Sequence, residues 1–157
     1  MARSPYVLTS AAVVATAVLG GAGTDVRSRW YRRLDEPAWD PPGPVYGPVW
    51  TAVYALTAIA TGRALTRVTD PAARRGYLGA LGVNLALNAG WSWVFFRGHR
   101  PDWATAEAAV LEASTLDLLR RTWRLDRVGG ALLAPYAGWV GFATALSAEI
   151  ARRNDAG

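Results

Sequence analysis

The arginines of this chain divide it into a series of long apolar stretches. All 17 basic residues are arginine, and they gather in clusters at residues 27–33, 63–75, 97–100, 120–127 and 152–153. The stretches between the clusters are about 20 residues long, the length that a helix needs to cross a hydrocarbon core of about 30 Å. Arginines that flank apolar segments are typical of the ends of membrane-spanning helices. The pattern therefore predicts an all-α membrane protein, a bundle of five transmembrane helices.

The five predicted spans form one domain that covers residues 1–157. They comprise residues 6–23, 45–66, 77–96, 103–123 and 129–150. The first span also resembles a signal peptide, because Arg3 precedes its apolar core and small residues close it, but its length and the spans that follow favour a membrane helix. The arginines divide almost equally between the two sides, so the positive-inside rule does not set the orientation.

The composition excludes several kinds of site. A net charge of +5 also suits nucleic acid, but here the arginines punctuate apolar segments instead of lining one face. We therefore expect the lipid bilayer, and no nucleic acid, as a partner. The chain has no cysteine and a single histidine, His99, so disulfides, thiolate sites and histidine-rich metal sites are excluded and we expect no metal site.

Prolines mark the predicted loops and two of the spans. A proline-rich loop of a length that is often functional covers residues 25–44. Pro48 falls in the first turn of the predicted second span, where proline is tolerated. Pro135 lies inside the fifth span, and we expect it to kink the helix.

The fourth span carries three acidic residues, and each carboxylate costs about 2.5–3.5 kcal/mol at the bilayer centre. Glu107 lies near the helix N-terminus, where the helix dipole favours an anion. Asp117 can pair with Arg120 and Arg121, three and four residues later. Glu112 has no such neighbour and needs a partner, a cavity or a proton.

Polar and aromatic residues line up at helical spacing on three of the spans. The three stripes contain Trp50, Tyr54, Thr57 and Thr61; Asn84, Asn88, Trp91 and Phe95; and Tyr136, Trp139 and Ala143. Such stripes serve either as helix–helix contacts, through amides that hydrogen-bond across an interface, or as the wall of a ligand pocket. Because indoles in the middle of a span fit the interfacial belt poorly, we expect a pocket inside the bundle.

The side chains of this predicted pocket favour a flat, aromatic, apolar ligand. Arginines of the first loop are suited to bidentate contact with carboxylates; they are Arg27, Arg29, Arg32 and Arg33. A porphyrin with propionate groups meets both demands. The usual axial ligands of haem iron are His, Cys, Met or Tyr, and cysteine is absent while His99 and Met1 lie outside the spans. We therefore expect a metal-free porphyrin as ligand and no required cofactor.

Three blocks of sequence resemble the TspO/MBR family, the tryptophan-rich sensory proteins. They read W-Y-x-x-L-x-x-P-x-W-x-P-P-x-x-V-Y-x-x-V-W-x-x-x-Y (residues 30–54), N-x-x-W-S-x-x-F-F (residues 88–96) and A-L-L-A-P-Y-x-x-W-x-x-F-A (residues 131–143). The resemblance implies a five-helix bundle, often a homodimer, with a pocket for porphyrins and other hydrophobic ligands under the first loop. By position it implies the ligand contacts Trp39, Trp50, Tyr54, Asn88, Trp91, Tyr136, Trp139 and Ala143.

The resemblance leaves three kinds of function open. The first is a sensor, carrier or scavenger of tetrapyrroles. The arginine-only composition favours a bacterial cell membrane as the location of the protein. The second is light-dependent porphyrin degradation, in which Trp50 and Trp139 are the photochemical candidates; the sequence shows no other catalytic constellation. The third is proton-coupled transport through Glu112. Sterol recognition is not implied, because no tyrosine lies between Leu146 and Arg152.

Overall fold

The computed structural model describes residues 4–155, and Arg3 of the predicted N-terminal flank lies outside them. The described chain is helical and contains no strand. Its five long helices are α1 (Pro5–Gly23), α2 (Gly43–Arg67), α3 (Pro71–Ser92), α4 (Pro101–Leu125) and α5 (Arg127–Asn154). A 3₁₀ turn, η1 (Tyr31–Arg33), lies in the first loop, and a π-helical turn, η2 (Trp93–Arg97), extends α3.

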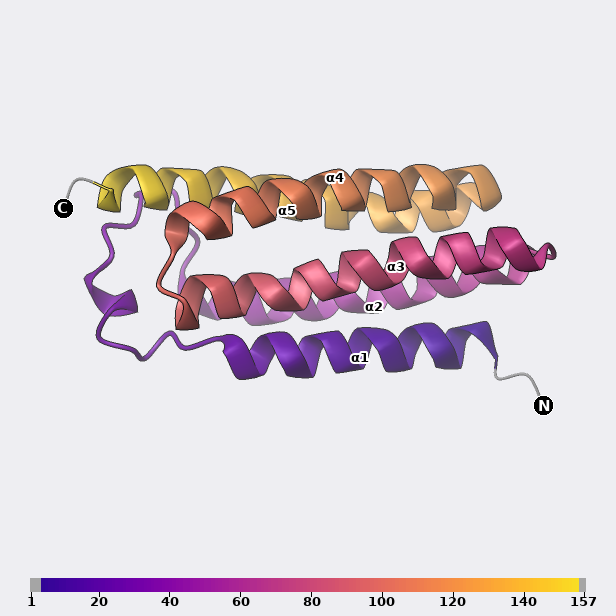
Figure 1. Cartoon of the computed structure of the whole chain (residues 1–157), viewed down its shortest axis with the longest axis horizontal. Helices are drawn as coiled ribbons and strands as arrows, with labels where there is room; N and C mark the ends of the chain where they lie inside the picture. Colours follow the sequence, from indigo (N-terminus) through magenta and orange to yellow (C-terminus); the bar gives the residue numbers. More distant parts are fainter. Residues whose placement is uncertain (1–3, 156–157) are drawn as a thin grey trace.

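The helices lie side by side along the long axis of the molecule and alternate in direction (Figure 1). The helices form a closed ring in the order α1, α2, α5, α4 and α3, and α3 packs against α1. The first loop, the α3–α4 connection and the C-terminal end of α5 share one end of the bundle (Figure 1). The predicted fold, an all-α bundle of five helices, is confirmed.

Most of the helices begin where the sequence supplies a proline or a capping carboxylate. Pro5, Pro71 and Pro101 each stand at the first position of a helix, where the missing N–H would have no intrahelical partner. Asp70 caps α3 by accepting a hydrogen bond from the Ala73 amide at 2.7 Å. Asp126 caps α5 in the same way through the Gly129 amide at 3.0 Å.

Two helices begin before the predicted spans that they contain. The third helix begins at Pro71, ahead of the span predicted from residue 77, because the Asp70 cap and the following proline start the helix before its apolar part. The second helix begins at Gly43, so the expectation that Pro48 falls in its first turn is wrong, and Pro48 lies inside the helix. Pro48 therefore leaves the Pro44 carbonyl without an intrahelical donor.

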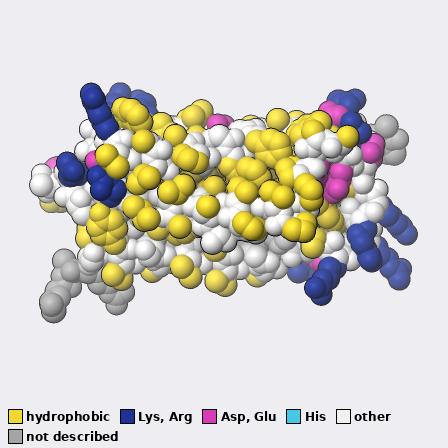
Figure 2. All heavy atoms as spheres, turned by 180° about the vertical axis from the view of Figure 1, so that it is seen from behind, with side chains coloured by type: hydrophobic (Ala, Val, Ile, Leu, Met, Phe, Trp, Pro, Cys, Tyr) yellow, Lys and Arg dark blue, Asp and Glu magenta, His cyan; other side chains and the backbone are white. Residues whose placement is uncertain are grey.

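On the face that Figure 2 shows, charged side chains gather at the two ends of the bundle, and the middle is largely hydrophobic or uncharged. The α1 and α5 helices are long and apolar enough to cross a membrane by themselves.

At the end opposite the first loop, Arg63 donates to Asp126 at 2.6 Å. This hydrogen bond, together with the one from the Gly129 amide, outweighs the opposing effect of burial and holds the pKa of Asp126 below its usual value. The ion pair ties the end of α2 to the start of α5.

Close contacts between small residues hold α1 against α2. The Thr9 hydroxyl donates to the Ala58 carbonyl at 2.8 Å, and a Cβ placed on Gly62 would lie 2.6 Å from the ring of Tyr6. This contact lies toward the arginine-rich end of α2, remote from the first loop.

Candidate ligand-binding cavity

A cavity of about 600 Å³ lies inside the loop end of the bundle, within the range of small-molecule sites. All five helices and the first loop contribute to its wall. Its lining residues are Ala17, Gly20, Gly21 and Thr24 of α1 and its end; Val26, Tyr31, Glu36 and Asp40 of the loop; Gly43, Tyr46, Trp50 and Tyr54 of α2; Asn88, Trp91, Ser92, Phe95 and Phe96 of α3 and η2; Ala108 and Leu111 of α4; and Trp139, Val140, Ala143, Leu146, Ser147 and Ile150 of α5.

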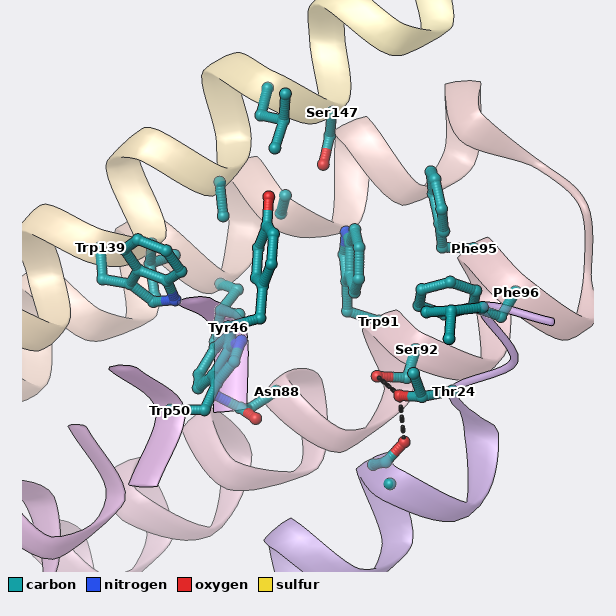
Figure 3. Close-up of a pocket in the computed structure, with 18 of the residues that line it drawn as sticks. Thr24, Tyr46, Trp50, Asn88, Trp91, Ser92, Phe95, Phe96, Trp139 and Ser147 are labelled. Atoms are coloured by element: carbon teal, nitrogen blue, oxygen red, sulfur yellow. Dashed lines mark hydrogen bonds between the residues drawn. The ribbon is translucent and has the colours of Figure 1, made fainter. Parts of the chain in front are cut away.

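Aromatic rings from α2 and α5 form one wall. The ring centroids of Trp50 and Trp139 are 6.3 Å apart, with the planes nearly perpendicular. Tyr54 lies 5.3 Å from Trp50, and Tyr46 lies 5.7 Å from Trp139 in an edge-to-face arrangement. Figure 3 shows Trp50, Trp91 and Trp139 grouped around Tyr46. The wall offers both ring faces and ring edges to a flat ligand.

The opposite wall comes from α3 and η2. Trp91 stacks on Phe95 with centroids 4.9 Å apart and an interplanar angle of 11°. The π-helical turn brings Phe95 and Phe96 inward together, at 2% and 7% exposure, while Trp93 is turned outward and donates to the Leu19 carbonyl at 2.9 Å. Such turns recur at functional sites.

A chain of hydrogen bonds runs from the cavity wall into the core. The Tyr54 hydroxyl donates to Asn88 Oδ1 at 2.8 Å, and Asn88 Nδ2 donates to the Tyr136 hydroxyl at 2.8 Å. Tyr136 in turn donates to Asn84 Oδ1 at 2.9 Å, and Asn84 Nδ2 donates to Thr115 Oγ1 at 2.9 Å. The chain joins α2, α3, α5 and α4, and fixes the orientation of the Asn88 amide.

Two indole N–H groups in the wall have no acceptor within residues 4–155. They belong to Trp91 and Trp139, and both Nε1 atoms are buried. An indole nitrogen is a donor only, and a buried donor without a partner costs about 1–3 kcal/mol. A ligand that brings hydrogen-bond acceptors into the cavity would recover part of that cost.

The loop side of the cavity is acidic. Glu36 and Asp40 line it, and we call this pair the acidic rim. The Tyr46 hydroxyl donates to Asp40 Oδ1 at 2.6 Å. Burial and the neighbouring Glu36 carboxylate raise the pKa of the Tyr31 hydroxyl, so this phenol stays neutral at physiological pH.

The loop arginines that we expected to meet ligand carboxylates do not line the cavity. They are Arg27, Arg29, Arg32 and Arg33, and all four are exposed. The sequence shows that they belong to the first loop, but the direction in which each points depends on the loop path and on the η1 turn. Contact between these arginines and ligand carboxylates stays a prediction, which the lining of the cavity does not support.

The predicted contact residues divide into three groups. Six of them line the cavity: Trp50, Tyr54, Asn88, Trp91, Trp139 and Ala143. Tyr136 lies behind the wall at 1% exposure and acts through its hydrogen bonds. Trp39 is 49% exposed and packs edge-on against Phe142 at 5.8 Å, outside the lining.

Sequence reasoning missed Tyr46, Ser147 and the acidic rim. Tyr46 lies four residues before Trp50, and Ser147 lies four residues after Ala143, so both continue stripes that we ended one turn too soon. The two carboxylates lie in an irregular loop, where no periodic signal marks the residues that face inward.

The acids of α4 lie outside the cavity. Asp117 pairs with Arg120 and Arg121 at 2.8 and 2.6 Å, as predicted. Glu107 and Glu112 each have one buried carboxylate oxygen without a partner in the described chain. Their other oxygens lie against glycines of neighbouring helices: Gly90 beside Glu107, and Gly141 beside Glu112.

Comparison with known proteins finds one family model and several similar proteins. The model of the TspO/MBR family matches residues 8–153. The chain is 30% identical to the translocator protein of Homo sapiens, over 80% of this chain and 75% of that protein. It is 32% identical to the tryptophan-rich sensory protein of Cereibacter sphaeroides, over 80% and 77%. It is 29% identical to Protein CrtK of Rhodobacter capsulatus, over 90% and 89%.

Proposed function

Because the chain belongs to the TspO/MBR family of membrane proteins, we propose that its cavity binds a tetrapyrrole-type aromatic ligand and that it acts as a sensor, carrier or scavenger. The observation that carries this proposal is a cavity of about 600 Å³ whose wall includes Trp50, Trp91 and Trp139. The names of two relatives, a translocator protein and a tryptophan-rich sensory protein, agree with such a role. We place the protein in a bacterial cell membrane, as a homodimer.

The donor set of the cavity favours a metal-free ring. Among residues 4–155 the lining contains no His, Cys or Met, and His99 instead stacks on Trp30 with centroids 4.6 Å apart. Tyrosine can bind haem iron, but the hydroxyls of Tyr46 and Tyr54 are already hydrogen-bonded to Asp40 and Asn88. The third lining tyrosine, Tyr31, stays protonated because burial and Glu36 raise the pKa of its hydroxyl. The wall therefore contacts the ring and its edges, without ligating a central metal.

Replacing Trp50 and Trp139 together by phenylalanine should weaken porphyrin binding about fivefold, since smaller rings lose about 1 kcal/mol of contact. The measurement is a titration of protoporphyrin IX in detergent in darkness, followed by porphyrin absorbance so that the loss of tryptophan does not change the signal. The matched control is Trp103→Phe, because Trp103 is 61% exposed and does not line the cavity. Unchanged affinity in the double variant would contradict the proposed contacts.

Light-dependent porphyrin degradation is a second candidate, favoured by the close pair of Trp50 and Trp139 in the wall. If it operates, new absorbing products should form under illumination with oxygen and not in darkness. The rate should fall in the Trp50→Phe, Trp139→Phe double variant under saturating porphyrin. Equal product formation with and without protein would leave binding as the only role.

Proton-coupled transport through Glu112 stays a prediction, and Glu112 does not line the cavity.

A further inference from the structure

The acidic rim is the charged part of the cavity lining. Glu36 is exposed and Asp40 is half-buried, and both line the cavity from the first loop. Neither carboxylate forms an ion pair with a described residue. By contrast, Asp35 of the same loop lies outside the lining and pairs with Arg153 at 3.6 Å. The negative charge of the rim therefore faces whatever occupies the cavity.

The deeper wall has the opposite hydrogen-bonding character. The buried indole nitrogens of Trp91 and Trp139 are donors that lack acceptors among the described residues. Asn88 Oδ1 already accepts from Tyr54, so this amide oxygen adds little acceptor capacity. In Figure 3, Asn88, Trp91 and Trp139 lie around the cavity together with Tyr46. A well-matched ligand thus brings acceptors to the buried wall and donors or positive charge to the rim.

Resting on the proposed function, we propose that the acidic rim selects aromatic ligands whose loop-facing edge is cationic or hydrogen-bond-donating, and disfavours ligands with free carboxylates at that edge. Like charges that approach each other across a poorly solvated interface are costly, and opposite charges supply specificity. Glu36 and Asp40 are therefore specificity-determining residues of the cavity. The ligand has the same ring as in the proposed function, and the rim selects among the substituents on that ring.

Three derivatives of one ring test this inference: protoporphyrin IX as the free dicarboxylic acid, as its dimethyl ester, and as a bis-amide that bears primary ammonium groups. Each is titrated in darkness against the wild-type protein in uncharged detergent and followed by porphyrin absorbance. The cationic amide should bind about tenfold or more tightly than the free acid, with the ester between them.

The double variant Glu36→Gln, Asp40→Asn should remove this order. Asn at position 40 keeps an oxygen that can accept from Tyr46, so the local hydrogen bond is retained. The affinity for the uncharged dimethyl ester should change less than the affinity for either charged derivative, and thermal unfolding of the variant checks that the bundle is intact. The matched control is Asp35→Asn, which removes one charge from the same loop and should preserve the wild-type order.

The outcomes separate the two proposals. If the free acid binds the wild-type protein as tightly as the cationic amide does, or if the order survives in the double variant, the role of the rim is refuted while tetrapyrrole binding stands. If none of the three derivatives gives saturable binding, the proposed function is refuted and the inference about the rim with it.

Discussion

Replacing Ala143 by phenylalanine should weaken porphyrin binding more than any other single change in the wall, by at least about tenfold, or about 1.4 kcal/mol. Ala143 lies on α5 one turn beyond Trp139, and its side chain lines the cavity. A phenyl ring at this position extends into the space that a ligand would occupy. Because it fills a cavity instead of entering a packed core, we expect little of the about 1–3 kcal/mol penalty that overpacking usually brings.

The measurement is again a titration of protoporphyrin IX in darkness, together with thermal unfolding of each variant. The matched control is Ala131→Phe, which makes the same substitution on the exposed surface of the same helix. The control should bind as the wild-type protein does. Wild-type affinity in Ala143→Phe, with a folded protein, would show that the ligand binds elsewhere.

Helical periodicity explains why much of the cavity wall could be predicted from the sequence. Residues three and four positions apart share one face of a helix, so Trp50 and Tyr54 must lie together, as must Trp139 and Ala143. That these faces turn inward followed from the cost of exposing amides such as Asn88 to lipid. Six of the eight predicted contacts accordingly fall in the lining of one cavity.

The remaining parts depend on contacts between segments that are distant in the sequence. Trp39 lies in the irregular first loop, so its distance from the cavity depends on the loop path and not on a helical register. The same holds for Glu36 and Asp40, which proved to lie where the arginines were expected. Glu107 was assigned to the helix terminus from its position alone, whereas its surroundings depend on Gly90 of the neighbouring helix.

The residues at the helix starts explain why α2 and α3 begin before the predicted spans. An apolar span and a helix are different objects, because a helix can continue into water where a cap supports it. Asp70 and Pro71 start α3 before the apolar segment begins, and Gly43 starts α2 before Pro48 is reached. Reading Asp70 as a cap before the hydropathy would have placed the start of α3 correctly, whereas no side-chain cap marks the start of α2.

Replacing Tyr136 by phenylalanine should lower the free energy of unfolding by about 1–3 kcal/mol. Tyr136 is 1% exposed, accepts a hydrogen bond from Asn88 Nδ2 and donates one to Asn84 Oδ1. Phenylalanine keeps the ring but removes the acceptor of Asn88 Nδ2 and the donor to Asn84 Oδ1, so that one buried amide N–H group and one buried amide oxygen lose these partners. Because Asn88 is then held only through the hydrogen bond from Tyr54, we also expect weaker porphyrin binding. The measurement is reversible unfolding in mixed micelles with increasing dodecyl sulfate.

The matched control for this prediction is Tyr77→Phe. Tyr77 is 3% exposed and shares one hydrogen bond of 2.7 Å with the Thr122 hydroxyl. Thr122 also donates to the Leu118 carbonyl at 2.7 Å, so it keeps a partner when the phenol is removed. The same chemical change therefore leaves an amide N–H group and an amide oxygen unpartnered in one case, and only a hydroxyl lone pair in the other. Equal losses of stability in the two variants would contradict the prediction. A larger loss at Tyr136 would show that the two amide atoms left without partners carry the cost.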